Sequence, residues 1–289
     1  MEKIGSQKIW SYFDHRTSLV PAKDHTIRAG PGHSVPTYFQ LAMKVAELQF
    51  KNRDYVLLFR GQREDYKTTQ KNSTLKPSLF RLDGKKPPSD AVLQKRFDTL
   101  RHAEERLITK YVSSGLPDSL RLKRQRVIRW AILQHYEVCP TPLLDVSQSL
   151  RIAASIATHG NKTDEAFLFV LGVPNLSGAI TADSGGSLQI IRLSSACPPS
   201  AVRPHIQEGY LLGEYPEFSD FRQKGQYTYY EMDFGRRLVA KFRFNPNTFW
   251  KSKNYPAASD DALYPKEHRD PLLVIAAEIK AELVSRSSA

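Results

Sequence analysis

Cysteine is scarce in this chain, and long apolar runs are absent. The 289 residues include only two cysteines, Cys139 and Cys197, too few for a disulfide framework and too far apart for a C-x-x-C metal pair. We therefore expect two inert core thiols in a reducing compartment, the cytoplasm. No segment approaches the roughly 18 consecutive apolar residues of a transmembrane helix. The N-terminal segment also lacks the apolar core of a secretory signal.

Several common catalytic signatures are missing as well. The chain has no G-x-x-x-x-G-K-[ST] phosphate-binding loop, no G-x-S-x-G nucleophile elbow and no H-E-x-x-H zinc motif. Its eight histidines are scattered without the spacing of metal ligands. The sequence therefore argues against P-loop, hydrolase-elbow and zincin chemistry, and we expect no metal cofactor.

Positive charge is plentiful and unevenly distributed. The formal net charge is +12, and residues 51–129 hold 20 Lys or Arg against 9 Asp or Glu. A concentrated basic segment favours a polyanionic partner, such as nucleic acid, or a phosphate-bearing ligand. The alternative is a solvated surface that keeps the protein soluble. Aromatic residues do not interleave with these charges, which argues against a stacking platform for single strands. We expect no membrane partner, and the oligomeric state stays open.

The order of the predicted elements favours an α+β fold, with helices concentrated in the first half and strands in the second. We expect a polar, irregular N-terminal arm over residues 1–35 and one domain over 36–289, with C-terminal strands and a helix over 213–289. Apolar periodicity predicts helices over 37–50, 90–113, 118–137, 152–158 and 272–284. Apolar runs predict strands over 55–60, 143–146, 166–173, 188–193, 227–234 and 238–244.

The stretch Tyr55-Val-Leu-Leu-Phe-Arg-Gly-Gln62 places a charge at the end of an apolar strand. Burying the Arg60 guanidinium without an acidic partner is costly, so we expect it to be paired or to face a ligand. Gly61 permits a tight turn or a close backbone approach. The alternative for Arg60 is a structural ion pair, because arginines that extend from a strand end to a surface carboxylate are common.

Two further polar clusters border apolar elements. The first contains Gln134, His135, Tyr136, Thr141, Asp145, Ser147 and Ser149, and the second contains Arg203, Gln207 and Glu208. Asp145 follows two leucines and needs a cation or several donors, for which Arg60 is a candidate in a site or in a purely structural bridge. The serines and His135 also have purely structural explanations. Ser147 or Ser149 can cap the helix that begins near Leu150, and a helix C-terminus favours His135.

Four blocks of this sequence resemble the signatures of the FRG domain family, which is named for an aromatic-Arg-Gly motif. They are LLFRGQ (57–62), LKPSLFR (75–81), LQHYEVCPTPLLDVSQSLRIAASIA (133–157) and RPHIQEGYL (203–211), and together they cover about residues 36–212. The family's middle block resembles Q-H-[HY]-G-x-P-T-R-L-L-D-W-T. Here Glu137 stands where that block has Gly, one residue is added before Pro140, Pro142 replaces the usual Arg and Val146 replaces the usual Trp.

A second resemblance is to ADP-ribosyltransferases of the Arg-Ser-Glu type, whose core is a split sheet. Their aromatic-Arg-Gly, Ser-x-Ser and Gln/Glu-x-Glu motifs occur in the same order as Phe59-Arg60-Gly61, Ser147-Gln148-Ser149 and Gln207-Glu208-Gly209. The resemblance implies NAD as substrate and Arg60, Gln207, Glu208 and His135 as catalytic residues. It implies a cofactor-binding set of Arg60, Gly61, Gln62, Tyr136, Thr141, Asp145, Ser147 and Ser149. The resemblance further implies a toxin or phage-defence effector that modifies a nucleic acid or protein acceptor.

The third motif departs from this pattern, because Gly209 occupies the position of the family's catalytic glutamate. Three alternatives remain open: Glu208 lies on a bulge or turn, another carboxylate such as Glu231 acts, or catalysis is lost. The competing function is a non-enzymatic nucleic-acid-binding module that uses the basic helices of residues 51–130. A hydrolase or nuclease built on His135 and Asp145 is a third reading without a supporting motif.

Overall fold

The computed structural model describes residues 4, 9–14, 16–84, 86–226, 232–251, 255–266 and 270–287. One eight-stranded sheet has the order β3-β10-β6-β4-β5-β9-β8-β7, and a two-stranded sheet pairs β1 with β2. Only β3 and β10 pair in parallel in the large sheet. The strands are β1 Ile9–Ser11, β2 Val20–Ala22, β3 His33–Ser34, β4 Val56–Gln62, β5 Leu144–Ser147, β6 Ala166–Val173, β7 Ile180–Asp183, β8 Leu188–Arg192, β9 Gly209–Glu214 and β10 Leu238–Phe244. The predicted α+β class is confirmed.

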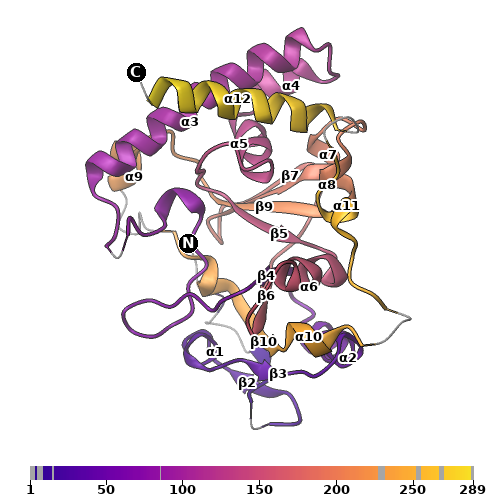
Figure 1. Cartoon of the computed structure of the whole chain (residues 1–289). Coiled ribbons are helices and arrows are strands. Elements are labelled where there is room, and N and C mark those ends of the chain that lie inside the picture. The colour runs from indigo at the N-terminus through magenta and orange to yellow at the C-terminus, as the bar shows by residue number, and fades with distance from the viewer. Residues whose placement is uncertain are drawn as a thin grey trace.

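Helices surround the large sheet and gather at its two ends (Figure 1). The helices α3, α4, α5 and α12 lie at the end of the sheet that contains β5, β9 and β7. The helices α1, α2 and α10 lie at the other end, which contains β3 and β10. The bounds are α1 Asp24–Ala29, α2 Tyr38–Lys51, α3 Asp90–Ser113, α4 Ser119–Arg124, α5 Arg126–His135, α6 Leu150–Thr158, α7 Leu193–Ala196, α8 Val202–Ile206, α9 Phe221–Gly225, α10 Pro246–Phe249, α11 Asp260–Leu263 and α12 Pro271–Ser287. The structure also contains the 3₁₀ turns η2 Ser78–Phe80 and η3 Phe234–Arg237.

The centre of the core is β6, which is buried along its whole length. Its sequence AFLFVLGV shows no alternation, as expected for a strand covered on both faces. Gly172 lies where a Cβ would be 2.5 Å from the Ile4 side chain, so the strand backbone itself forms part of the packing surface. The two halves of the chain are not segregated, since β4 from the first half pairs with β6 from the second.

Most predicted elements occur where the sequence placed them. The helices over 37–50, 90–113, 152–158 and 272–284 and the strands over 55–60, 143–146, 166–173, 188–193 and 238–244 are confirmed with small shifts at their ends. Two helices begin with a side-chain cap: Ser89 accepts a hydrogen bond from Val92 N at 3.4 Å, and Ser149, one of the two serines expected to cap, accepts one from Ile152 N at 3.5 Å. Asp118, which was also expected to cap a helix, makes no such bond. Residues 227–231 of the predicted strand 227–234 lie outside the described residues.

The helix predicted over 118–137 is two helices instead of one. The break lies at Gln125, with φ −103° and ψ 98°, and Asp118 has φ 61° without a capping bond from its side chain. Arg129 of α5 donates to the carbonyls of Leu122 at 2.8 Å and Lys123 at 2.9 Å. The carbonyls left free at the end of α4 are thus satisfied by a side chain, which makes the break stable.

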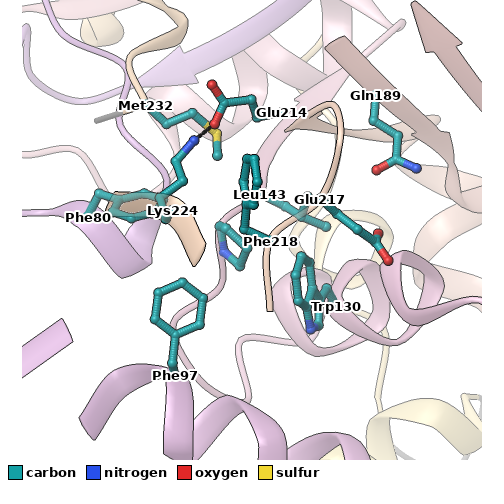
Figure 2. A pocket seen from close by; sticks show the side chains of 11 residues that line it. Phe80, Phe97, Trp130, Leu143, Gln189, Glu214, Glu217, Phe218, Lys224 and Met232 are labelled. Atoms are coloured by element: carbon teal, nitrogen blue, oxygen red, sulfur yellow. Dashed lines mark ion pairs between the residues drawn. The ribbon is translucent and has the colours of Figure 1, made fainter. Parts of the chain in front are cut away.

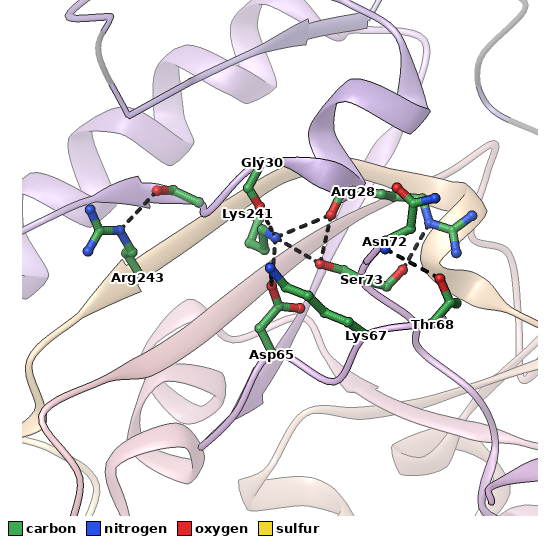
Figure 3. A network of polar contacts seen from close by, with 10 residues as sticks. Arg28, Gly30, Asp65, Lys67, Thr68, Asn72, Ser73, Lys241 and Arg243 are labelled. Carbon is green, nitrogen blue, oxygen red and sulfur yellow. Dashed lines mark hydrogen bonds and ion pairs between the residues drawn. The ribbon is translucent and has the colours of Figure 1, made fainter. Parts of the chain in front are cut away.

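The N-terminal segment, expected to be an irregular arm, contributes regular structure. It forms β1, β2, α1 and β3, and β3 joins the large sheet beside β10. A buried lysine holds this segment in place (Figure 3): Lys241 Nζ of β10 contacts the carbonyls of Arg28 and Gly30, Asp65 Oδ2 at 2.7 Å and Ser73 Oγ at 2.8 Å. These bonds anchor the loop that follows β4.

Candidate functional site

The large sheet is nearly divided between β4 and β5. These strands pair through one residue pair, Phe59 with Ser147, whereas β4 and β6 pair continuously from Val56 to Gln62. The sheet therefore consists of two four-stranded halves, β3-β10-β6-β4 and β5-β9-β8-β7, that touch at one point (Figure 1). Arg60 is the residue immediately after this junction.

Gly61 is required by the approach of α6. A Cβ built at Gly61 would lie 1.8 Å from the carbonyl oxygen of Ala153 and 2.9 Å from Ala157 N. No side chain fits at that distance, so the helix rests directly on the strand backbone. The glycine of the Phe59-Arg60-Gly61 motif is thus explained by packing, and it fixes α6 against the strand that carries Arg60.

Arg60 is a cation with too few partners. One of its terminal nitrogens donates to the backbone carbonyl of Asp145, and its Nε is buried without a partner among the described residues. Burial lowers the pKa of Arg60 to about 10, with a further decrease from the Arg81 charge that the Asp145 charge opposes. The guanidinium therefore stays charged at neutral pH while its hydrogen-bonding capacity is incompletely used.

Asp145 is oriented by a chain of side chains. Its Oδ2 accepts from Gln134 Nε2 at 3.0 Å, and Gln134 Oε1 in turn accepts from the hydroxyls of Thr141 at 2.7 Å and Ser78 at 2.8 Å. Burial alone would raise the pKa of Asp145, but the His135 hydrogen bond, the charges of His135 and Arg60 and the Gln134 amide lower it. The carboxylate is ionised and 32% of the side chain is exposed. It can therefore meet a ligand from solvent.

His135 contacts the other oxygen of the Asp145 carboxylate, Oδ1. Its Nδ1 is 3.4 Å from Asp145 Oδ1, and its Nε2 is buried without a partner among the described residues. Burial is the main cause of a lowered pKa for His135, so the ring is neutral at pH 7. With Nδ1 donating to Asp145, Nε2 is left as a free proton acceptor. Arg60, Asp145 and His135 thus form one cluster.

Gln62 and Thr141 border this cluster in different ways. Gln62 is two residues beyond Arg60 on β4 and therefore on the same face of the strand, and its Oε1 is buried without a partner in the described part of the chain. Thr141 is fully buried, and its hydroxyl is used within the chain of side chains that orients Asp145. Gln62 thus keeps an unused acceptor beside the cluster, whereas the Thr141 hydroxyl is used to orient Asp145.

Hydrogen bonds of Ser147, Ser149 and Gln207 join neighbouring backbone segments. Ser147 Oγ donates to the Gln207 carbonyl at 2.7 Å and accepts from Ser149 N at 3.0 Å, while Ser149 caps α6. The Gln207 side-chain amide donates to the Leu263 carbonyl. The capping alternative for Ser149 is therefore confirmed. These side chains join β5, α6 and the α8–β9 turn, and their hydrogen bonds are already made within the protein.

The Tyr136 hydroxyl is bonded within the protein. Its hydroxyl donates to the buried Asp270 carboxylate at 2.8 Å, which also accepts from Leu272 N at the start of α12 at 3.1 Å. Burial and the neighbouring Asp270 charge raise the pKa of Tyr136. The hydroxyl that was expected to bind a cofactor anchors α12 instead.

The third expected motif does not bring a glutamate to the cluster. Glu208 is exposed in the turn before β9, where its φ of 45° is left-handed. At Gly209 a Cβ would lie 2.9 Å from the Leu193 side chain and 3.3 Å from His135 Cε1. The position expected to hold the catalytic glutamate is thus filled by neighbouring side chains, which excludes a larger residue. Glu231, the other candidate, lies outside the described residues.

Three residues near the cluster lie outside the expected catalytic and cofactor-binding sets. Gln134 and Ser78 orient Asp145 through their hydrogen bonds; the sequence signal was their presence within the LQHYEV and LKPSLFR blocks. Arg203 contacts Glu137 Oε1 at 3.0 Å and lies 5.2 Å from the ring of Tyr264, a partly exposed tyrosine. Its charge also contributes to the lowered pKa of His135.

Glu137 explains one departure from the FRG pattern. Its φ is 55°, in the left-handed region that favours glycine, so the family's glycine suits the backbone here. In this chain a glutamate adopts that conformation and places its carboxylate on Arg203. Backbone strain at this position is therefore accompanied by an ion pair beside the cluster.

A second polar feature lies at the edge of β9, away from this cluster. Lys224 of α9 forms a buried ion pair with Glu214 of β9 beside a small cavity that Phe80, Phe97, Trp130 and Phe218 also line (Figure 2). The cavity measures about 10 Å³, room for about one water molecule. None of the expected site residues lines it. This pair attaches α9 to the sheet and leaves no room for a substrate.

Comparison with known proteins identifies the segment that holds the cluster. The family model of the FRG domain matches residues 56–166, which includes Arg60, His135 and Asp145. Residues 56–166 of this chain are an FRG domain. No curated protein and no solved structure matches the chain. The FRG match begins at β4 and ends at the first residue of β6, so it contains both strands of the junction.

Two further features of the FRG protein bear on its partners. Within the described residues, no group of three or more His, Cys, Asp or Glu side chains is placed to hold a metal ion. Nor is any described helix both long enough and apolar enough to cross a membrane.

Proposed function

We propose that this FRG protein is an ADP-ribosyltransferase-like enzyme that uses NAD as substrate, with Arg60, His135 and Asp145 as its reactive groups. The observation that supports it most is the incompletely paired Arg60 guanidinium beside a carboxylate and a neutral imidazole at the sheet junction. Arg60 is partly buried, and its buried Nε without a partner among the described residues is costly unless an anion completes its hydrogen bonds. The diphosphate of a dinucleotide supplies such an anion.

The residues present fit this substrate. Arg60 Nε is a free donor for a phosphate oxygen, and Gln62 Oε1 is a free acceptor on the same strand face for a hydroxyl or carboxamide group. The exposed part of Asp145 supplies negative charge nearby. Arg60 would hold the phosphate, and Asp145 would lie next to the sugar.

The proposed reaction transfers ADP-ribose from nicotinamide to an acceptor. The bond between ribose C1′ and the nicotinamide nitrogen breaks, and its electron pair leaves with nicotinamide. A bond forms between C1′ and an acceptor oxygen or nitrogen, whose proton passes to His135 Nε2. The Asp145 carboxylate stabilises the positive charge that develops at C1′. Asp145 thereby takes the part that the resemblance gave to Glu208. Such an activity would suit a toxin or a phage-defence effector.

The test is nicotinamide release from labelled NAD in the presence of RNA, DNA and protein acceptors. We expect Arg60→Gln and Asp145→Asn each to lower release and transfer by about 100-fold or more, as when a transition-state electrostatic contact is lost. The matched controls are Arg101→Gln and Asp98→Asn, which break a partly exposed i,i+3 pair on α3 and should leave the rate unchanged. Absence of release with every acceptor, or a normal rate in Asp145→Asn, would refute the proposal.

Nucleic-acid binding by the basic segment is the second candidate function. The cations that are not already paired within the protein are the ones that would bind the nucleic acid. Many of the segment's cations are paired internally: Arg126 and Arg129 bind the buried Glu104 at 3.0 Å each, and α12 carboxylates bind Arg106 and Lys110. An open groove of about 550 Å³ along α4 is lined by Arg121 and Arg124. This groove favours α4 as the contact surface for a nucleic acid, whether as acceptor or as sole ligand.

Salt dependence distinguishes this second role. Because Lys123 and Arg124 are exposed, the variant Lys123→Glu with Arg124→Glu should weaken RNA or DNA binding and reduce the salt slope by about 2. Binding that is independent of salt, or unchanged in this variant, would exclude the α4 surface. Retention of NAD chemistry in the same variant would separate recruitment from catalysis.

A further inference from the structure

Helix α2 carries an apolar stripe on the face that points away from the core. Leu41, Val45 and Leu48 are buried, whereas Phe39 is 57% exposed, Met43 51% and Phe50 61%. At about 100° per residue these two sets project in opposite directions. A helix that packs only against its own protein needs one apolar face, and α2 has two.

The exposed stripe has the spacing of a coiled-coil seam. Phe39, Met43, Ala46 and Phe50 are separated by four, three and four residues, and all four are exposed. This is the alternation of d and a positions over two heptads. The seam is about 16 Å long at 1.5 Å rise per residue, or three helical turns.

A groove beside the seam extends the apolar surface. It has a volume of about 610 Å³ and is lined by Trp10, Leu19, Ala46 and Phe50, with Glu47 and Lys51 at its edge. Helix α2 lies at the end of the molecule opposite α12 (Figure 1). The surface is therefore both elongated and hollowed, which suits a convex helix.

The end of the seam is basic. Lys51 Nζ lies 5.4 Å from the Trp10 ring and 5.9 Å from the Phe50 ring, and the Arg53 guanidinium lies 4.4 Å from the Phe50 ring. The cations thus cover part of the apolar surface while their charge points outward. Acidic side chains that border an apolar stripe on a partner helix would complement them.

Charge and shape argue against the two other occupants. In a second copy packed antiparallel, Lys51 and Arg53 would face the positive N-terminal end of the other α2, and in a parallel copy they would face each other. A flat anionic membrane would leave the groove unfilled. We propose that the exposed face of α2 and the adjoining groove form a docking surface for an acidic amphipathic helix of another protein.

Synthetic peptides test this proposal directly. The probe is a fluorescein-labelled 21-residue peptide with leucine at a and d positions and glutamate at e and g, which keeps it monomeric. Its controls have lysine at e and g, or the acidic composition in scrambled order. We expect the acidic heptad peptide to raise the anisotropy with an affinity at least about tenfold greater than either control.

Variants of the full chain locate the contact. Phe39→Glu with Met43→Glu should lower the affinity by about tenfold or more, and Lys51→Glu with Arg53→Glu should shift the preference toward the basic peptide. Gln40→Glu adds a charge in the same turn beside the seam and should have little effect. Unfolding curves of each variant check that α2 remains folded.

Three results would overturn the proposal. One is equal binding of acidic, basic and scrambled peptides, or binding that the Phe39 and Met43 substitutions leave unchanged. A second is a dimer in sedimentation that Phe39→Glu dissociates, which would assign the face to a second copy. A third is binding to phosphatidylserine vesicles that depends on Phe39 and Met43 without peptide binding, which would assign it to a membrane.

Discussion

Two cations stand on the strands that flank β6, Lys241 on β10 and the partly buried Arg60 on β4. Lys241 is 1% exposed, and its ammonium group contacts four oxygens of the N-terminal segment and the loop after β4 (Figure 3). Arg60, with five N–H donors, makes one hydrogen bond to a backbone carbonyl and leaves Nε unpartnered among the described residues. The lysine is satisfied by its own protein and the arginine is not.

The difference separates a cation that builds the fold from one that is available to a ligand. Lys241 joins segments that are far apart in sequence, since Gly30 and Asp65 meet at its ammonium group. Arg60 joins only β4 to β5, and it lies beside an ionised carboxylate and a neutral imidazole. Burial lowers the pKa of both cations, so burial alone does not distinguish them; the number of filled hydrogen bonds does.

The largest effect on stability is expected at the satisfied cation. Lys241→Met keeps most of the side-chain volume but removes the cation that lies 2.7 Å from the Asp65 carboxylate, which is 6% exposed and keeps the partly exposed Lys67 ammonium at 3.7 Å. Breaking a buried pair in this way costs roughly 3–5 kcal/mol. Urea unfolding followed by circular dichroism measures it, with Arg243→Met, which lies on the same strand and forms partly exposed ion pairs, as the control. A loss below about 1 kcal/mol would show that the Lys241 network is not structural.

The matching change at Arg60 should act on function instead. Arg60→Met removes the cost of burying a guanidinium and loses one hydrogen bond, while Asp145 keeps Gln134 and His135 as partners. We expect the free energy of unfolding to change by no more than about 1 kcal/mol. Nicotinamide release should fall to background in the same preparation. If Arg60→Met destabilises the protein as much as Lys241→Met, Arg60 is a structural cation and the contrast fails.

The smallest expected effect is the pH dependence of stability that comes from the His135 ring. Its pKa is lowered from 6.5 in the folded state, so the unfolded chain takes up a proton first as pH falls. This contribution to stability is complete above about pH 6.5 and is lost as pH falls toward the lowered folded value. Between pH 7.5 and 5.5 the wild type should lose about 1 kcal/mol more than His135→Gln. Identical losses in the two proteins would show that His135 is readily protonated in the fold.

Local sequence was sufficient for most elements and for part of the site. The unbroken apolar run of β6 and the spacing of Leu93, Phe97 and Leu100 in α3 gave correct boundaries because periodicity and caps are local properties. The motif around Arg60 was expected to hold a site, and its apolar run with a terminal charge is visible without a structure. The break at Gln125 was missed because its cause, Arg129 bonding to the carbonyls at the end of α4, depends on how two helices meet.

The sequence by itself determined the α+β class, the strand that ends in Arg60-Gly61 and the presence of polar residues around Asp145, since each depends on short-range patterns. Only the tertiary structure decided which of those polar residues are already bonded. Tyr136 bonds to Asp270, 134 residues away, and Ser147 bonds to the Gln207 carbonyl, whereas Arg60 Nε and His135 Nε2 have no partner among the described residues. Hydrogen-bond partners are chosen by chain segments that meet on folding, and for this reason a list of polar residues cannot separate a site from its supports.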